Sequence, residues 1–270
     1  MPDLLVIAAV GVWIVAIAAT VALCRATSER TALLVVALLA GVVAAKVATH
    51  GVQPADASAR GKATTVRVPD DVRFAQQWQF AKGNAMGAQR AWSLGRGGAV
   101  AVAIVDSGLD LSHPDLQANL WTNSREVPGN GVDDDGDGHV DDVHGWDFAN
   151  NDADPADDNG HGTHVAGIVA ARGDNGIGVT GVAWRARIMP VKAVDQHASG
   201  TSSAVAEGIR YAAAHGARII LLALAGTEPG AFLEDAVRAA SDAGALVVCA
   251  AGNGGRDVDV QPSFPASFVY

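Results

Sequence analysis

The sequence is poor in aromatic residues, cysteine and positive charge. Aromatic residues fill only 5 % of the 270 positions, while glycine is abundant, which favours close packing of helices against a sheet. The two cysteines, Cys24 and Cys249, lie in unlike apolar segments, so we expect no disulfide, and they identify no redox compartment. The 29 Asp and Glu residues outnumber the 19 Lys and Arg residues. The net charge of −10 argues against nucleic acid as a partner.

Two long apolar segments open the sequence. Leu4–Cys24 carries no charged residue, and Thr31–Ala48 carries only Lys46, near its end. Each has close to the roughly 20 residues needed to cross a bilayer, so residues 1–48 predict two transmembrane helices. A cleaved signal peptide is the alternative for the first segment, but no Lys or Arg precedes it.

The charges around these segments give opposing indications of orientation. Arg25 and Arg30 lie in the short loop between the segments and favour a cytoplasmic loop. Lys46, Arg60 and Lys62 follow the second segment and favour the opposite orientation. We expect a multi-pass protein of the cell membrane with its main domain outside the cytoplasm.

The main domain is predicted over residues 70–270, after a polar, alanine-rich linker at 49–69. Val100–Val105 is a continuous apolar, β-branched segment, as expected of a strand buried on both faces. Alternating helices and strands follow, which predicts an α/β fold with a doubly wound parallel sheet. The predicted helices are 161–171, 202–215 and 228–243, and the further strands are 187–194, 217–224 and 245–251.

Asp106 ends the first buried strand, and Gly108 follows as a turn residue. In a doubly wound sheet, functional residues gather at the carboxyl ends of the strands. A carboxylate there is costly to bury unless it is hydrogen-bonded. Asp106 is therefore a candidate functional residue, with a turn or capping role as the alternative.

The segment His-Gly-Thr-His, residues 161–164, carries two histidines three positions apart. The zinc-protease pattern needs histidines four apart with a glutamate between them, which is not the case here. Asn159 and Gly160 instead indicate a helix start at His161. The helix dipole there disfavours the charged imidazole, so His161 can accept a proton. His164 is expected to be a core histidine.

Three segments together resemble the subtilase (subtilisin-like) family of serine proteases: VAIVDSGLDLSHPDL, NGHGTHVAGI and VVCAAGNGG. They occur in the family's order, and the resemblance runs from about Asp71 to the chain end. It implies a subtilisin-like fold and a serine endopeptidase acting on peptides or proteins. It also implies that Asp106 orients His161, that His161 is the general base, and that the Asn253 amide donates to the oxyanion.

The resemblance further implies two substrate strands, Ala198–Gly200 and Ala223–Ala225, that pair with an extended peptide by backbone hydrogen bonds. The family commonly has Asn-x-Ser-x-Gly in its second substrate strand, whereas this chain has Leu221, Ala223 and Ala225. Ala225 adds a methyl group near the expected S1 pocket, which leaves open a non-catalytic, peptide-binding pseudoprotease. The implied substrate-binding residues are Ala198, Ser199 and Gly200, Ala223, Leu224 and Ala225, and Ala250, Ala251 and Gly252.

The family's nucleophile segment, Gly-Thr-Ser, does not occur in the sequence. Ser263 and Ser267 lack its context. We therefore expect a C-terminally incomplete catalytic domain whose serine lies beyond Tyr270, and a chain that is inactive alone. No inhibitory propeptide is recognisable before Asp71.

The acidic stretch GNGVDDDGDGHVDD predicts a hard-cation site. Asp133, Asp135 and Asp137 alternate and precede a glycine, as in the first half of an EF-hand loop, and Asp141 follows. His144 stands where the twelfth-position glutamate belongs, so the segment is no EF-hand. Oxygen ligands indicate Ca²⁺, as in subtilases with a similar insertion, and a solvated acidic loop is the alternative.

A second calcium site is implied by resemblance alone, at the segment GDNGIGVTGVA. A turn role after Pro114 is the alternative for its aspartate Asp115. No organic cofactor is indicated. The implied ligands are the carbonyls of Gly173, Ile177 and Val179 and the side chains of Asn175, Asp115 and Asp71.

The leading hypothesis is thus a membrane-anchored, calcium-stabilised, subtilisin-like serine endopeptidase. The pseudoprotease and a calcium-dependent membrane scaffold are its rivals.

Overall fold

The computed structural model describes residues 68–80, 87–255 and 257–268. The chain divides into two units, Met1–Ala63 and Thr64–Tyr270, and the described residues all belong to the second. The predicted transmembrane helices, residues 1–48, lie outside the described residues. Within the described ranges, no helix is long and apolar enough to cross a membrane.

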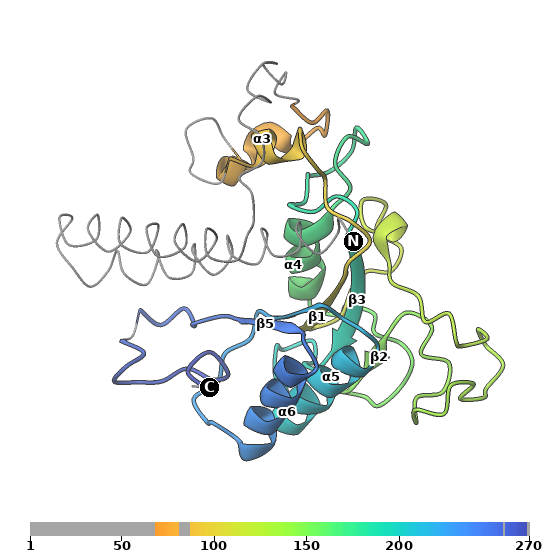
Figure 1. Ribbon diagram of the computed structural model, residues 1–270, viewed down its shortest axis with the longest axis vertical. Helices are drawn as coiled ribbons and strands as arrows, with labels where there is room; N and C mark the ends of the chain where they lie inside the picture. Colours follow the sequence, from red (N-terminus) through yellow and green to blue (C-terminus); the bar gives the residue numbers. More distant parts are fainter. Residues whose placement is uncertain (1–67, 81–86, 256, 269–270) are drawn as a thin grey trace, which may run out of the picture. The chain divides into compact units, whose positions relative to one another are not determined.

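Five parallel strands form the centre of this unit, in the order β2-β3-β1-β4-β5 (Figure 1). The non-consecutive order requires crossovers, which the intervening helices supply. The predicted parallel α/β fold is therefore confirmed. The strands are β1 (Ala101–Asp106), β2 (Trp146–Asp147), β3 (Arg187–Lys192), β4 (Ile219–Leu222) and β5 (Leu246–Cys249).

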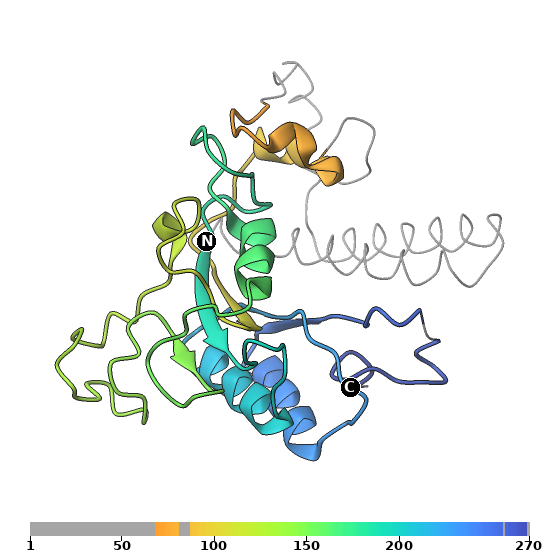
Figure 2. The same cartoon turned by 180° about the vertical axis from the view of Figure 1, so that it is seen from behind.

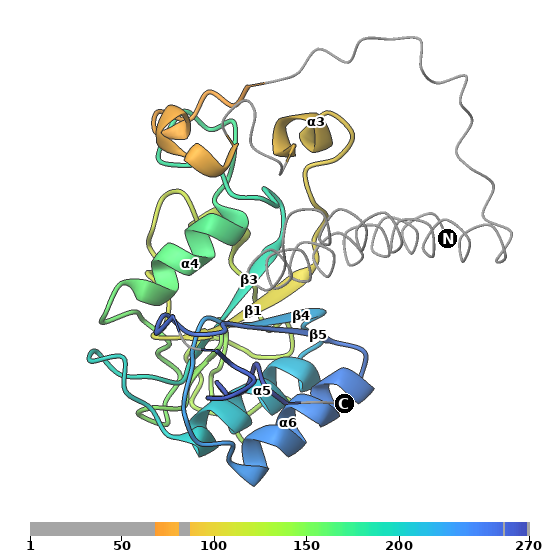
Figure 3. The ribbon, with the colours of Figure 1, turned by 90° about the vertical axis from the view of Figure 1, so that its left-hand side faces the viewer.

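Helices cover both faces of the sheet. Figure 3 shows α4 on one face, and α5 and α6 side by side on the other. The helices are α3 (Ala88–Trp92), α4 (His161–Ala170), α5 (Ser202–Ala214) and α6 (Ala231–Asp242), with short 3₁₀ helices η2 (Phe74–Gln76), η3 (Trp78–Phe80) and η4 (Gln117–Asn119).

The alternation of side chains along β1 builds two separate cores. Val102 and Ile104 face α4 and pack with Ala166 and Ala170. The intervening residues, such as Val105, belong to the core formed with α5 and α6. Because small alanines line α4, this helix lies close to the sheet, as the composition predicts.

The predicted helices and strands are present but shorter than predicted. The strand predicted at 217–224 is formed only over Ile219–Leu222, because Ala217 still bonds back to the Ala212 carbonyl at the end of α5. At the other end, the chain leaves the β-ladder, and Gly226 forms an antiparallel bridge with Phe264.

The acidic insertion, which we define as residues 122–145, lies between η4 and β2. It extends beyond the β2 edge of the sheet (Figures 1 and 2). Its base is tied down by the Asn123 amide, which donates to the Val143 carbonyl at 2.8 Å. The insertion is thus closed on itself next to the sheet.

Candidate active site

Asp106 and His161 are hydrogen-bonded to each other at the carboxyl end of β1. The Nδ1 atom of His161 lies 2.7 Å from Oδ1 and 2.9 Å from Oδ2 of Asp106. The Asp106 side chain is 1 % exposed, while that of His161 is 48 % exposed. In the neutral imidazole, donation from Nδ1 to the carboxylate places the lone pair on Nε2, which can accept a proton.

The turn after β1 holds this pair in place. The Ser107 amide donates to Asp106 Oδ1 at 2.8 Å, so the buried carboxylate has a backbone hydrogen bond in addition to its contact with His161. The Ser107 hydroxyl accepts from the Gly162 amide at 3.0 Å and donates to Asp157 at 2.8 Å. The serine thus links the strand that carries the acid to the helix that carries the base.

Asp157 fixes the start of α4. Its carboxylate accepts hydrogen bonds from the amides of Asn159, Gly160 and Thr163 and from the Thr163 hydroxyl. Desolvation raises the pKa of Asp157, but these hydrogen bonds outweigh it and bring the pKa to about 2. The ionised carboxylate therefore satisfies free amides at the positive end of the helix.

Two glycines allow α4 to approach the turn after β1. A Cβ on Gly162 would lie 2.2 Å from the Gly108 carbonyl oxygen. A Cβ on Gly108, whose φ is +110°, would lie 2.5 Å from the Pro155 carbonyl oxygen. Side chains at these positions would push His161 away from Asp106, which explains why glycine follows each of the two residues so closely.

Lys192 is a buried cation next to this turn. Its side chain is 2 % exposed, and Nζ donates to the Ser107 carbonyl at 3.0 Å and to Asp158 Oδ1 at 2.6 Å. Our sequence analysis did not identify Lys192, Asp157 or Ser107. The sequence signal was a lysine inside an otherwise apolar strand, since lysine is almost never fully buried unless it is paired.

The ends of β4 and β5 bring two predicted substrate segments together. The ladder between the strands ends where the Ala250 amide donates to the Leu222 carbonyl at 2.9 Å. Ala223–Ala225 and Ala250–Gly252 follow at the same edge, and a Cβ on Gly252 would lie 3.8 Å from the Ala225 Cβ. Asn253 lies in the exposed bend that follows. All of these residues share the carboxyl edge with Asp106, as predicted for parallel strands.

Neither of the two implied substrate strands is part of the sheet. Ala198 lies in a bend after β3 with a φ of 56°, Ser199 and Gly200 are irregular, and Ala223–Ala225 follows β4 without strand pairing. The Asp195 carboxylate accepts from the amides of His197 and Ser199, and the Asp195 amide donates to the Ser199 carbonyl. These bonds hold the pKa of Asp195 below its usual value, the Ser199 amide contributing most. A substrate role for the two segments stays a prediction.

The prediction that His164 is a core histidine is wrong. His164 is exposed on α4, because the helix buries Gly162, Ala166 and Ala170 instead. A histidine three positions from His161 points away from the stripe formed by these small residues. It therefore takes no part in the hydrogen-bond network around Asp106.

The loop at residues 173–180 surrounds the buried carboxylates of Asp71 and Asp115, the two aspartates implied as ligands of the second calcium ion. Asp71 accepts from the Thr180 hydroxyl at 2.7 Å and from the Asp174 amide at 2.9 Å. Asp115 accepts from the Asn175 side chain at 2.8 Å and from the Val179 amide at 2.9 Å. Within the described residues, neither carboxylate forms a salt bridge with Lys or Arg. Coordination by the Gly173, Ile177 and Val179 carbonyls stays a prediction.

The four aspartates predicted for the acidic site have different partners in the structure. Asp133 accepts from the amides at positions 136–138, and Asp141 from the amides of Asn130 and Gly131. These two carboxylates thus stabilise turns of the insertion. Backbone hydrogen bonds, that of Gly138 foremost, hold the pKa of Asp133 below its usual value. Glu126, which the sequence analysis missed, lies with Asp133 and Asp135 in one group whose ligand atoms are all within 4.8 Å.

Comparison with known proteins agrees with this geometry. The family model described as "Subtilase family" matches residues 97–269. Thermitase from Thermoactinomyces vulgaris is 40 % identical over 181 residues, which are 67 % of this chain and 56 % of thermitase. The thermophilic serine proteinase of Bacillus sp. (strain AK1) is 38 % identical over 196 residues, 72 % of this chain and 43 % of that protein.

A solved structure shares the fold. The structure described as "Proteases from Pseudoalteromonas arctica PAMC 21717" matches with a TM-score of 0.56 and 28 % identity, over 69 % of this chain and 60 % of that one. The chain spans about half the length of the curated relatives it matches. Since the family match covers more than half of the sequence and includes both Asp106 and His161, the chain belongs to the subtilase family.

Proposed function

We propose that the protein is a serine endopeptidase that hydrolyses peptide bonds in peptides or proteins. The bidentate contact between His161 Nδ1 and the buried Asp106 carboxylate carries this proposal. Asp106 holds the imidazole in the tautomer that accepts a proton at Nε2 and stabilises the imidazolium that forms. The named activities of thermitase and the AK1 proteinase support the same reaction class.

The nucleophile in this proposal is a serine of a Gly-Thr-Ser segment in the whole protein. His161 takes the proton of its hydroxyl, the oxygen attacks the peptide carbonyl, and His161 returns the proton to the leaving amine. The Asn253 amide donates to the oxyanion from the edge next to the substrate segment. The half-buried apolar residues of the edge strand β5 support the packing of further chain there.

Calcium stabilises the domain in this proposal. Buried carboxylates are normally paired or bound to metal, and Asp71 and Asp115 are 5 % and 2 % exposed. Their oxygen-rich loop suits a hard cation such as Ca²⁺. A second calcium ion in the acidic insertion would draw on Asp133 and Asp135, which lie close to Glu126.

The protein is anchored in the cell membrane, with its catalytic domain outside the cytoplasm. This part of the proposal is based on the two apolar segments and on the arginines between them. Labelling of the 25–30 loop and protease digestion of the domain in intact cells tests it. Digestion of the domain with a protected loop supports the orientation, and the reverse pattern contradicts it.

A peptide-binding pseudoprotease is the second candidate. The observation that favours it is Ala225, whose side chain stands next to Gly252 where the family commonly has glycine. Hydrolysis of an unstructured protein by the whole protein, with a His161→Ala variant as control, separates the candidates. Cleavage that depends on His161 supports the peptidase, and saturable peptide binding without cleavage supports the pseudoprotease.

A further inference from the structure

A histidine that the proposed reaction does not use lies at the end of α5, against the acidic insertion. The His215 side chain is 2 % exposed. Its Nδ1 lies 2.9 Å from the Tyr211 carbonyl oxygen, so Nδ1 carries the proton and donates it. The other nitrogen, Nε2, is buried and makes no hydrogen bond of adequate geometry. His215 therefore presents a lone pair, or a second proton, to the insertion.

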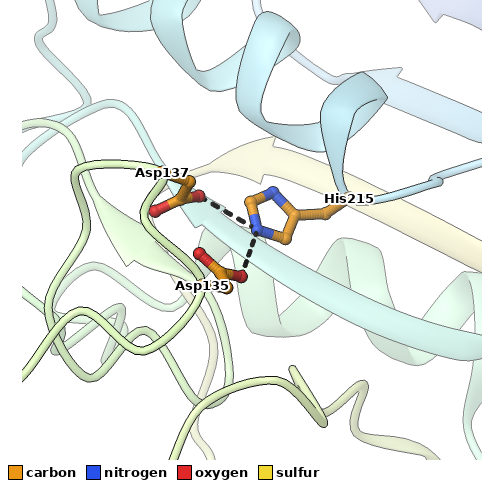
Figure 4. Close-up of side chains that lie close together, drawn as sticks. All are labelled: Asp135, Asp137 and His215. Carbon is orange, nitrogen blue, oxygen red and sulfur yellow. Dashed lines mark ion pairs between the residues drawn. The ribbon is translucent and has the colours of Figure 1, made fainter.

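Three carboxylates of the insertion surround this nitrogen. Nε2 lies 3.1 Å from Asp137 Oδ2, 3.6 Å from Asp142 Oδ2 and 3.9 Å from Asp135 Oδ2. Figure 4 shows Asp135 and Asp137 both directed at the same imidazole nitrogen. The Oδ1 atom of Asp135 is also buried and has no hydrogen-bond partner. Two polar atoms with no hydrogen bond thus belong to the same cluster.

In the described part of the chain, the three carboxylates have few cationic partners besides the histidines His139 and His215, which both lie 3.1 Å from Asp137. Among the described residues, Arg125 is the only Lys or Arg that forms a salt bridge with them, at 2.9 Å from Asp135, and its side chain is 55 % exposed. Asp142 is fully buried, and its carboxylate accepts hydrogen bonds from Asn123 and Tyr211. Buried carboxylates in such numbers are normally balanced by a cation.

The geometry suits a metal ion bound by nitrogen and oxygen. Zinc lies about 2.0–2.2 Å from nitrogen and oxygen ligands, so two ligand atoms of a tetrahedral site are roughly 3.4 Å apart. The distances from His215 Nε2 to the carboxylate oxygens, 3.1 to 3.9 Å, span this value. Metal-binding histidines usually donate their other ring N–H to a carbonyl or carboxylate, as His215 does to Tyr211. A surface pocket lined by Asp137, Glu207 and Arg210 gives solvent access to the cluster.

We propose that Asp135, Asp137 and His215 bind a transition-metal dication of the Zn²⁺ class, which ties the acidic insertion to α5. The imidazole distinguishes this site from a calcium site, because Ca²⁺ takes oxygen ligands whereas imidazole suits Zn²⁺ and its neighbours. Asp135 belongs both to this cluster and to the group with Glu126 and Asp133 that is proposed for calcium, so the two ions would share its carboxylate. Asp142 lies beside the ion and is positioned by the Tyr211 hydroxyl, which donates to it. The proposal is independent of the peptidase activity, since neither Asp106 nor His161 takes part.

Titration of the full 270-residue chain with Co²⁺, followed by visible absorption, tests the proposal. We expect one Co²⁺ per chain, displaced by Zn²⁺ but not by excess Ca²⁺. His215→Gln should weaken binding by more than about 100-fold, beyond the loss typical of an outer-shell partner. His144→Gln is the matched control, because its ring contacts the Trp121 carbonyl outside the cluster. That variant should bind Co²⁺ as the wild type does.

Several outcomes would overturn the proposal. They are a folded wild type that binds no Co²⁺, an unchanged affinity in His215→Gln, or binding that Ca²⁺ displaces and Asp133→Asn abolishes. Circular dichroism establishes that each variant is folded. Should His215→Gln not fold, the ¹⁵N resonance of His215 Nε2 in the wild type decides: a shift on adding Zn²⁺ supports the site, and no shift overturns it.

Discussion

His161 is oriented by Asp106, which belongs to a different part of the chain. A buried carboxylate fixes its Nδ1 side, while the other side of the ring faces solvent at the carboxyl edge of the sheet. The sequence was sufficient to predict both residues, because a strand that ends in Asp and a helix that starts with His each have a local pattern. Lys192 is visible in the sequence as a lysine inside an apolar strand, but its partners are not, and Ser107 has no local pattern at all, since their contacts are 34 to 85 positions away.

The first prediction concerns catalysis by this pair in the whole protein. Asp106→Asn should lower kcat by about 10⁴-fold, because it favours the wrong tautomer of His161. His161→Ala should lower kcat by about 10⁶-fold. Steady-state hydrolysis of a peptide measures both. His164→Ala, on the same helix but exposed, is the control and should retain wild-type kcat. Comparable losses in the control would show that the helix, and not the imidazole, had been damaged.

The second prediction concerns Asp157 and acid stability. Its pKa of about 2 lies below the roughly 3.9 of an unfolded aspartate, so its stabilising contribution is complete above about pH 4 and is lost as the pH falls towards 2. Asp157→Asn removes the charge that the hydrogen bonds at the start of α4 stabilise, so it should lower the free energy of unfolding by about 1–2 kcal/mol at pH 6, given the partial exposure of the side chain. Its difference from the wild type should shrink between pH 4 and 2 in urea titrations.

Asp154→Asn provides the comparison for this measurement. Asp154 lies nearby, is exposed and accepts one hydrogen bond at 3.3 Å from the Ala156 amide. It should change the stability little at any pH. A difference between Asp157→Asn and the wild type that stays constant from pH 6 to 2 would refute the proposed role of the ionised carboxylate.

At the scale of elements, glycines at the start of α4 and in the turn after β1 allow the two segments to pack closely. Periodicity predicted both elements within one or two residues, because each has a strong local pattern of apolar residues. The conformation of Ala198–Gly200 was not predicted, since hydropathy gives no sign of the hydrogen bonds that the Asp195 side chain accepts from the His197 and Ser199 amides. The resemblance to the family also gave no indication of these bonds.

Gly162→Ala provides the third prediction. The added Cβ would lie 2.2 Å from the Gly108 carbonyl oxygen, so α4 must shift from β1. We expect a loss of about 1–3 kcal/mol in the free energy of unfolding. Gly167→Ala is the matched control on the same helix, because its Cβ would meet no heavy atom within 4 Å. That variant should gain about 0.5–1 kcal/mol. Equal effects in both variants would contradict the proposed close approach.

At the scale of the whole molecule, the surface loops around the sheet depend on buried carboxylates. The resemblance to the subtilase family implied that Asp71 and Asp115 lie at the loop 173–180, and the structure brings them together. The sequence did not predict that the acidic insertion directs carboxylates at His215. That contact joins residues about 80 positions apart, which no local spacing can indicate.

Calcium dependence provides the fourth prediction. Ca²⁺ at about 100 times its Kd should raise the Tm by about 5–10 °C relative to chelator, because it binds the folded domain only. Asp115→Asn should reduce this rise, whereas Asp242→Asn, an exposed residue at the end of α6, should not. Differential scanning calorimetry in calcium and in chelator measures the effect. An identical Tm of the wild type in calcium and in chelator would contradict the proposal that the domain binds calcium.

The central claim is that Asp106 and His161 activate a serine for attack on a peptide carbonyl. Labelling of the whole protein with a fluorophosphonate, followed by mapping of the modified residue, tests it most directly. The account predicts stoichiometric labelling of one serine in a Gly-Thr-Ser segment, and loss of labelling in His161→Ala. A folded whole protein that stays unlabelled, or labelling that His161→Ala leaves unchanged, would contradict it.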